Sequence, residues 1–276
     1  MNKKSSSVGR ADYDTHVHTT FSPDGQSPIE DYIAAIDSGR ARGIGFTEHL
    51  DFLPECGAYR YLDTDNYFKK IQRYREMGYE LYAGAEVDYA ESVGQEILDT
   101  LEQKHFDYTI CSIHMINGFS ISDGRHTEAF AEVESARDIV EKYYRELISG
   151  IRVKEFDVIG HIGIFKRGLE KDHFEKNGLK GRLDELNDET ARICAASGKI
   201  LEVNSSGLFS TIEAPLPDSD FLKAYFQYGG RTVSMGSDAH NVANLCRGFE
   251  KVAEILKAVG FKYTFLPWDR ENGIKL

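Results

Sequence analysis

Residues 11–18 read Ala-Asp-Tyr-Asp-Thr-His-Val-His, a short run suited to a β-strand that ends in two histidines. In an extended chain the side chains alternate between two faces, so His16 and His18 point to the same side. Six further apolar runs along the chain end in a similar way, with polar residues directly after them. The fold class follows from what these seven stretches share.

The seven runs are short, continuously apolar and rich in β-branched and aromatic residues. They are Ala11–Val17, Gly43–Phe46, Tyr79–Val87, Phe106–Ile113, Phe156–Ile159, Lys199–Val203 and Thr232–Met235. Continuous apolar character favours strands that are covered on both faces in a parallel sheet. The polar residues that follow successive runs lie 28 to 47 residues apart, which is enough for a strand, a helix and two loops.

The stretches between the runs are predicted to be helices. Ser27-Pro28-Ile29-Glu30 has the spacing of a capping box, with proline at the first helical position, and this helix ends in a basic last turn before Gly43. The other predicted helices are Asn66–Met77, Glu128–Leu147, Asp184–Ser197 and Asn244–Val259. No linker or shift in composition divides the chain, so we expect one α/β domain over residues 11–276 after a flexible tail at residues 1–10.

The polar residues at the predicted strand ends are mostly histidines and carboxylates. In a parallel barrel the carboxyl ends of all strands meet on one face, and that face carries the chemistry. Six of the nine histidines occupy these positions, together with Glu86 and Asp238: His16, His18, His49, His114, His161 and His240. Imidazole and carboxylate without thiolate suit Zn²⁺, Mn²⁺ or Fe. The set exceeds the three protein ligands of a mononuclear catalytic zinc, so more than one metal is predicted.

Composition excludes several classes of protein. The 276 residues are 41% hydrophobic and 28% charged, which argues against both a membrane-spanning and a disordered chain. The net charge of −12 repels phosphate backbones, so neither a nucleic acid nor a membrane is expected as a partner. The four cysteines form no CxxC pair and the start lacks a secretory leader, which predicts free thiols and a cytoplasmic location.

The strand-end motifs, taken together and in order, resemble those of the PHP (polymerase and histidinol phosphatase) superfamily. They are Asp14-Thr-His-Val-His18, Thr47-Glu-His49, Gly84-Ala-Glu86, Ser112-Ile-His114, Gly160-His161 and Ser237-Asp-Ala-His240. Two longer stretches, at residues 106–118 and 47–52, look like the branch of monofunctional histidinol-phosphate phosphatases. The resemblance implies a distorted, TIM-like (β/α)7 barrel that holds three divalent ions (Zn, Mn or Fe).

The resemblance also implies which residues hold each ion. The first ion would be held by His16, His18, Glu86 and Asp238. Glu86 would bridge to a second ion, held also by His114 and His161. The third would be held by Asp24, His49 and His240, although Ser-Pro-Asp-Gly around Asp24 also reads as a β-turn.

One residue departs from the family pattern in the region expected to bind phosphate. Related phosphatases often carry an arginine shortly after the segment that reads Asn-Ser-Ser-Gly-Leu at residues 204–208, where this chain has Phe209. Lys166, Arg167 and Arg247 are the remaining candidates for gripping phosphate. Arg167 is favoured, because a guanidinium can bind two phosphate oxygens at once.

The activity implied by the resemblance is hydrolysis of L-histidinol phosphate, a step of histidine biosynthesis, by a hydroxide that the clustered metals generate. Glu86, Asp238 and His240 are assigned to catalysis. Acidic residues near the second and third strand ends could meet the substrate's positive charge, or could merely add to an acidic surface: Asp51, Glu55 and Glu91.

Three other functions remain open. A phosphoesterase of the same fold could act on a nucleotide or sugar phosphate, and Phe209 favours this reading. A 3′ exonuclease is disfavoured by the net charge. A metal-binding module without activity is the third, and it is disfavoured because such modules usually lose ligands. The sequence indicates no oligomeric state.

Overall fold

Seven parallel strands form a nearly closed barrel, which confirms the predicted fold class. The computed structural model describes residues 13–122, 130 and 133–276, so the predicted tail at residues 1–10 lies outside the described residues. The strands pair in the order in which they occur in the chain: β1 (Tyr13–Val17), β2 (Gly43–His49), β3 (Glu80–Asp88), β4 (Tyr108–Ser112), β7 (Val158–Ile159), β8 (Ile200–Asn204) and β9 (Val233–Gly236). The barrel closes where Val17 bridges to Ala239, just beyond β9.

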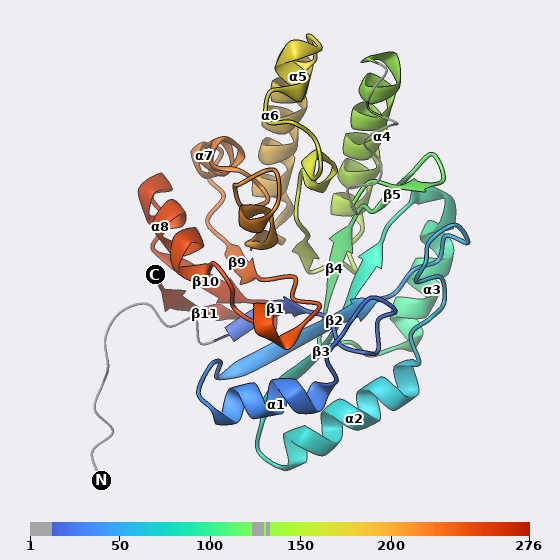
Figure 1. Ribbon diagram of the computed structural model, residues 1–276, viewed down its shortest axis with the longest axis vertical. Coiled ribbons are helices and arrows are strands. Elements are labelled where there is room, and N and C mark those ends of the chain that lie inside the picture. The colour runs from blue at the N-terminus through green and yellow to red at the C-terminus, as the bar shows by residue number, and fades with distance from the viewer. Residues whose placement is uncertain (1–12, 123–129, 131–132) are drawn as a thin grey trace.

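Helices surround the barrel in chain order (Figure 1). They are α1 (Ile29–Asp37), α2 (Thr64–Glu76), α3 (Gly94–Gln103), α4 (Val133–Arg152), α5 (His173–Lys176), α6 (Lys180–Ser197), α7 (Ser219–Gln227) and α8 (Phe249–Val259). Short 3₁₀ helices lie at Glu91–Val93, Ile164–Lys166, Ser206–Phe209 and Val242–Asn244. A small hairpin pairs β5 (Met115–Ile116) with β6 (Phe119–Ser120). Every residue of β4 and of β8 is buried, as continuous apolar runs in a covered parallel sheet predict.

Several predicted helix limits are wrong, and the first helix shows why. The Ser27 hydroxyl does not cap α1, because it accepts a hydrogen bond from the Val242 N–H at 3.1 Å instead. The helix ends at Asp37 without a basic last turn, and Arg40 beyond it donates to the backbone oxygens of Ala243 and Leu245. The Ser27 hydroxyl and the Arg40 guanidinium therefore hold α1 against the loop after β9. Sequence spacing does not reveal this contact.

The other helix limits shift by a few residues. The helix α2 is displaced by two residues at its start and one at its end, and α6 begins four residues early, at Lys180. The helix α4 ends at Arg152 rather than Leu147, and its predicted start lies outside the described residues. The helix α8 begins only at Phe249, because Gly248 has a left-handed φ of 81° that no continuous helix accepts.

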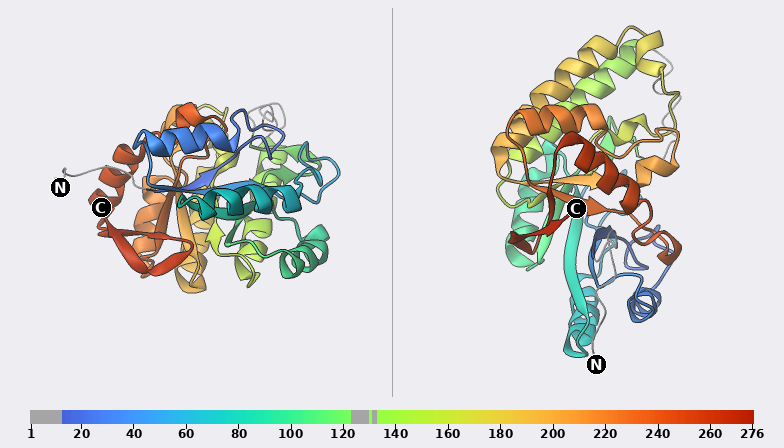
Figure 2. Two further views of the ribbon diagram at one scale, coloured as in Figure 1. Left: turned by 90° about the horizontal axis from the view of Figure 1, so that it is seen from below. Right: turned by 90° about the vertical axis from the view of Figure 1, so that its left-hand side faces the viewer.

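A C-terminal hairpin closes the amino-terminal mouth of the barrel. It consists of β10 (Tyr263–Leu266) and β11 (Asp269–Lys275), and Figure 2 shows it beside α8. Trp268, in its turn, stacks on Tyr82 with ring centroids 3.8 Å apart and lies edge-on to Tyr13. Gly45 leaves the space for this ring, since a Cβ there would collide with Trp268 and with the Tyr108 hydroxyl. Chemistry is therefore confined to the opposite, carboxyl-terminal mouth.

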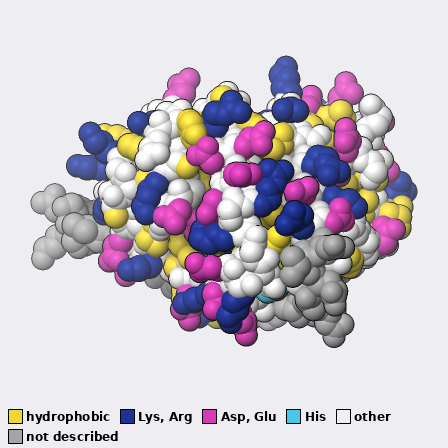
Figure 3. Space-filling model, turned by 90° about the horizontal axis from the view of Figure 1, so that it is seen from above, with side chains coloured by type: hydrophobic (Ala, Val, Ile, Leu, Met, Phe, Trp, Pro, Cys, Tyr) yellow, Lys and Arg dark blue, Asp and Glu magenta, His cyan; other side chains and the backbone are white. Residues whose placement is uncertain are grey.

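None of the helices in the described part of the chain is long and apolar enough to cross a membrane. On the face shown in Figure 3, acidic and basic side chains are interspersed. Histidine is visible there only as a small patch, in keeping with the burial of most strand-end histidines.

Candidate metal centre

The strand-end histidines and carboxylates converge at the carboxyl-terminal mouth of the barrel. Four overlapping groups of three residues each bring their ligand atoms within 4.8 Å of one another. They are His18 with His49 and His240, His16 with Glu86 and His161, His16 with His18 and Asp238, and His49 with Glu86 and His114. All eight residues come from strand ends that are far apart in sequence. The convergence expected of a parallel barrel is therefore present.

Glu86 lies at the centre of this cluster and is only 1% exposed. Its Oε1 lies 2.6 Å from His161 Nε2 and 3.2 Å from His114 Nε2. Its Oε2 lies 3.3 Å from the Nε2 atoms of both His16 and His18. The two oxygens of one carboxylate thus face two different sets of imidazoles, which is the geometry required of a bridging ligand.

Asp238 joins the His16–His18 side of the cluster. Its Oδ1 is 3.6 Å from His18 Nε2 and 3.8 Å from His16 Nε2, while its own φ of 55° turns the chain toward the barrel mouth. Burial alone would raise the pKa of this carboxyl. The positive charges of His16 and His240 outweigh burial and hold the pKa well below its usual range, so Asp238 stays ionised.

Asp24 meets His49 and His240 from the loop after β1. Its Oδ2 is 3.4 Å from His49 Nε2 and 3.1 Å from His240 Nε2. Burial would raise the pKa of Asp24, but its bonds to the two histidines lower it far below the usual range. The Asp24 side chain is 54% exposed, so it is the most open member of the predicted ligand set.

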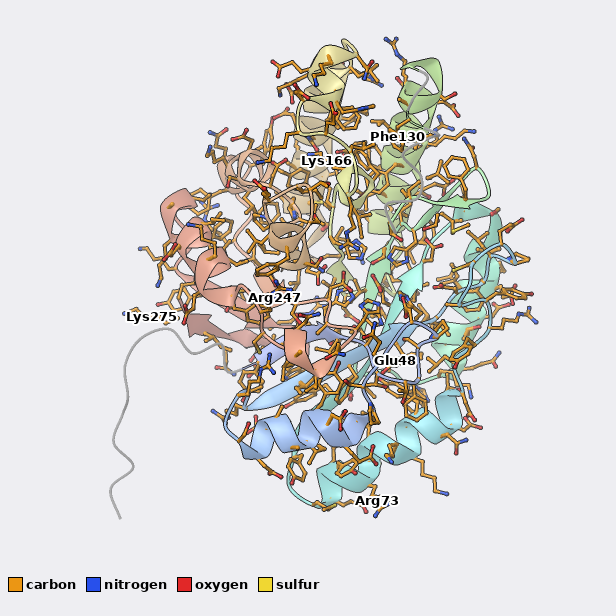
Figure 4. The ribbon with its side chains drawn as sticks, in the orientation of Figure 1. Glu48, Arg73, Phe130, Lys166, Arg247 and Lys275 are labelled. Atoms are coloured by element: carbon orange, nitrogen blue, oxygen red, sulfur yellow. The ribbon has the colours of Figure 1, made fainter. Side chains whose placement is uncertain are left out.

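Glu48 fixes the loop that carries Asp24. Its carboxylate, fully buried on β2 (labelled in Figure 4), accepts hydrogen bonds from the Thr19 backbone at 3.1 Å and from the Ser22 hydroxyl at 2.6 Å. The motif that contains Glu48 was noted in the sequence, but no role followed from it. The loop is short and polar, and this buried acceptor is what holds it against the barrel.

The chemistry of the donor atoms fits divalent cations. His240 Nδ1 donates to the Asp238 backbone oxygen at 3.0 Å, so its Nε2, which faces a carboxylate oxygen of Asp24, is the ring atom placed to bind a metal ion. The pair is 3.1 Å apart, and either a proton on Nε2 or a metal ion between the two atoms would join it. His49 Nδ1 is buried without a hydrogen-bond partner among the described residues, 3.3 Å from Glu86 Oε2.

Protonation does not extend to every histidine of the cluster: nearby carboxylates outweigh burial and raise the pKa of His16, His49, His114 and His240, whereas His18 behaves differently. Burial, together with the charges of His240 and His49, lowers the pKa of His18 to about 3. His18 therefore stays neutral near pH 7 and presents its Nε2 lone pair to the cluster. A neutral imidazole beside two carboxylates is the donor set that zinc, manganese and iron accept.

Glu202 supports two of these histidines, a role that the sequence pattern does not predict. Its Oε1 accepts from His16 Nδ1 at 2.6 Å, and its Oε2 accepts from the His161 backbone N–H at 2.8 Å. A carboxylate behind a ligating histidine sets the tautomer and orients the ring. The only sequence signal was a charged residue inside the apolar run Ile-Leu-Glu-Val-Asn at residues 200–204.

Two buried acidic residues near the ends of β2 and β3 accept hydrogen bonds from neighbouring protein groups. Asp88 Oδ1 accepts the His114 backbone N–H at 2.6 Å. Asp51, a candidate for meeting a substrate cation, is buried and accepts from the Cys56 thiol and the Asp88 N–H. The other two candidates, Glu55 and Glu91, lie at the surface.

A pocket of about 290 Å³ adjoins the cluster. Its lining combines cluster residues with two arginines and several small polar residues: Arg167, Ser206, Phe209, Ser210, Ser237, Asp238, His240, Asn244 and Arg247. Arg167 Nη2 donates to the Ser206 hydroxyl at 2.8 Å and lies 3.7 Å from Asp238 Oδ2. Its Nε is buried and has no hydrogen-bond partner within the described ranges.

Lys166, although adjacent to Arg167 in sequence, does not line this pocket. Its ammonium pairs with Asp218 at 2.9 Å, the residue that caps α7. Figure 4 places Lys166 high among the helices at the top of the view, whereas Arg247 lies lower, beside α8. The structure thus gives Lys166 a role in holding α7 rather than in the pocket.

Comparisons with known proteins agree with this geometry. A family model described as "PHP domain" matches residues 14–206. A protein of Thermotoga maritima named "probable histidinol-phosphatase" is 30% identical over 264 residues, which cover 95% of this chain and 99% of its own. A protein of the same name from Clostridium acetobutylicum is 26% identical over 259 residues, covering 92% and 96% of the two chains.

A solved structure shows the same fold. It is the histidinol phosphate phosphatase of Lactococcus lactis subsp. lactis, complexed with zinc, L-histidinol and phosphate. It superposes with a TM-score of 0.76 at 24% identity, over 95% of this chain and 99% of its own. Asp238 and His240 lie beyond the residues that the family model matches, yet the barrel closes by bringing them beside β1. Because the family model matches residues 14–206, well over half of the chain, this chain belongs to the PHP domain family.

Proposed function

We propose that this protein is a metal-dependent phosphomonoesterase that hydrolyses L-histidinol phosphate to L-histidinol and phosphate. One observation carries the proposal: Asp238 and His240 belong both to the ligand cluster and to the wall of the pocket that Arg167 lines. A small monoester in this pocket would place its phosphoryl group between a guanidinium and the cluster. The names of the Thermotoga and Clostridium relatives support histidinol phosphate as the substrate.

We propose that the cluster holds three divalent ions of zinc, manganese or iron. The first would be held by His16, His18, Glu86 and Asp238, the second by Glu86, His114 and His161, and the third by Asp24, His49 and His240. The Lactococcus structure of the same fold is complexed with zinc, which supports metal binding by this chain. When bound, clustered divalent ions lower the pKa of a bound water and neutralise charge on phosphoryl oxygens.

The residues of this chain would orient the reaction. Asp238 directs Oδ1 toward the histidines of the cluster and Oδ2 toward Ser206 and Arg167 in the pocket. Because its pKa is low, the carboxylate is ionised, and Oδ2 would accept a hydrogen bond from the attacking water and orient it. Arg167 would bind two phosphoryl oxygens and stabilise the negative charge that develops on them.

A panel of substrates tests the proposal. Phosphate release would be measured with L-histidinol phosphate and with nucleotide and sugar monophosphates, on protein reloaded with Mn²⁺ or Zn²⁺ after chelation. The proposal predicts a far higher kcat/KM for L-histidinol phosphate than for any other ester. A nucleotide or sugar phosphate that is hydrolysed faster would refute this substrate and favour the alternative phosphoesterase.

A pair of variants ties the activity to the site. Asp238→Asn should abolish turnover while the fold remains intact, because the negative charge of a proposed metal ligand is lost. Asp220→Asn, on the exposed face of α7, should leave turnover unchanged. Wild-type kcat in Asp238→Asn would remove Asp238 from the reaction.

We also propose that the protein acts in the cytoplasm as one domain over residues 11–276. All four cysteines are free thiols, which suits a reducing compartment. The bridge between Val17 and Ala239 joins the two ends of the sheet, so no cut through the barrel leaves a self-contained half.

A further inference from the structure

An exposed phenylalanine and an arginine stack on each other at the rim of the pocket. The guanidinium carbon of Arg247 lies 3.6 Å from the centroid of the Phe209 ring. The Phe209 side chain is 48% exposed. Gly248 makes the stack possible, because a Cβ there would come within 2.9 Å of Phe209 Cε2. The backbone beside Arg247 is thus shaped around this ring.

In the part of the chain that the structure describes, no carboxylate forms an ion pair with Arg247. Among the ion pairs of the described residues none includes Arg247, and its guanidinium donates only a 3.3 Å bond to the side-chain oxygen of Asn244. Arg167, by contrast, lies near the carboxylate of Asp238. In a protein of net charge −12, a guanidinium held in this way at a pocket wall attracts an anion.

We propose that Arg247, held by Phe209, is a second phosphate-binding residue that acts together with Arg167. Both arginines line the same pocket from different segments, Arg167 after the 3₁₀ helix Ile164–Lys166 and Arg247 just before α8. Phe209 is a positioning residue, which restricts the guanidinium by stacking on it. The proposal rests on the proposed function for the identity of the ester, but not for the binding of phosphate.

This assignment gives a physical account of the departure at position 209. The resemblance to related phosphatases leads one to expect an arginine there, and the apolar ring cannot bind phosphate itself. In this chain the ring supports an arginine from another segment, so the pocket still contains a second cation. This chain would then bind phosphate with different residues from those relatives, but with the same number of positive charges.

Inorganic phosphate is the direct probe of Arg247, because its binding to the metal-loaded protein can be measured by calorimetry without turnover. Arg247→Met keeps the length of the side chain and removes its charge. The Kd for phosphate should rise about tenfold or more, the scale expected for loss of a charge-assisted hydrogen bond. Inhibition by L-histidinol, which lacks phosphate, should be unchanged, as should the metal content. Unchanged phosphate affinity in Arg247→Met would overturn the proposal.

Coupling between the two residues tests the positioning role of Phe209. Phe209→Leu should weaken phosphate binding about threefold in the wild-type background, the scale of one exposed cation–π contact. In the Arg247→Met background it should have no further effect, because the ring then has no guanidinium to hold. Equal losses in both backgrounds would show that Phe209 contacts the ligand directly, and would overturn its positioning role.

A matched pair elsewhere in the barrel supplies the control. Arg231 stacks on Phe226, also at 3.6 Å, but it precedes β9 and so lies at the opposite mouth from Asp238. Arg231→Met and Phe226→Leu should leave phosphate affinity unchanged. A loss in Arg231→Met equal to that in Arg247→Met would reduce the effect to net charge and overturn the proposal.

The same experiments separate this proposal from the proposed function. Wild-type protein that binds phosphate but does not hydrolyse L-histidinol phosphate refutes the substrate, while Arg247→Met still decides the role of the arginine. Wild-type protein that hydrolyses the ester, with an unchanged KM and unchanged phosphate affinity in Arg247→Met, keeps the function and refutes the second phosphate-binding residue.

Discussion

Replacing Glu202 with glutamine removes a buried charge while keeping the shape of the side chain. In the native protein both carboxylate oxygens are acceptors, one from His16 Nδ1 at 2.6 Å and the other from the His161 N–H at 2.8 Å. A glutamine offers one acceptor oxygen and one amide nitrogen that only donates. One of the two donors must therefore lose its partner inside the barrel.

The substitution should affect both the stability of the metal-free protein and its affinity for metal. A buried donor without a partner costs about 1–3 kcal/mol, so the metal-free variant should unfold more easily by about that amount. Loss of the carboxylate behind a ligating histidine typically weakens metal binding about 10- to 100-fold. The two effects are separable, because the first is present without metal and the second appears only in the affinity for it.

The assay is a competition between the protein and a chromophoric zinc chelator, beside urea unfolding of the metal-free form. Glu80→Gln is the control, since Glu80 is a half-buried carboxylate on β3 at the opposite mouth, bonded to Arg42 and Tyr13. We expect weaker zinc binding only in Glu202→Gln. Wild-type zinc affinity in that variant would refute the reasoning, because the carboxylate would then neither orient His16 nor raise its basicity.

Three further outcomes are expected. Gly236→Ala should reproduce the weaker zinc binding without a change of charge, because its Cβ would displace Glu202 Oε1. Unchanged zinc affinity would show that the backbone of β9 shifts to make room for the Cβ. Asp24→Asn should lower the bound metal, measured by elemental analysis, by one ion per chain, and an unchanged metal content would remove Asp24 from the ligand set. Trp268→Ala should destabilise the fold by about 3 kcal/mol in urea unfolding, since it empties the stack on Tyr82 at the closed mouth; a loss confined to activity would contradict this.

The barrel and the gathering of its polar residues could be predicted because one geometric rule governs both. Parallel strands covered by helices require continuous apolar runs, and their carboxyl ends meet on one face. His16, Glu86 and Asp238 are distant in sequence, and their convergence follows from this rule alone. That they bind metal ions is a separate chemical inference, which stays a proposal.

The remaining features depend on contacts that sequence spacing does not encode. Lys166 and Arg167 are neighbours of similar charge, yet packing turns one toward Asp218 and the other toward the pocket. Ser27 has the spacing of a helix cap, but its hydroxyl accepts a hydrogen bond from the Val242 N–H, which lies in the loop after β9 and is distant in sequence. The hairpin that carries Trp268 has an exposed polar strand without alternation, so no pattern predicted it.

The role of Glu202 was missed for a different reason. A charged residue within a buried strand is a visible anomaly in the sequence, but its meaning depends on which residues face it across the barrel. His16 comes from β1 and His161 from the loop after β7, and only the closed barrel places both against the same carboxylate. Supporting residues of this kind follow from the structure.

The most direct test of the account is a metal titration of the chelated protein, followed by phosphate release from L-histidinol phosphate. We expect no release without metal, and full activity once the cluster around Glu86 has taken up three ions per chain. Activity that persists in the fully chelated protein, or a fully loaded protein that releases no phosphate, would contradict it.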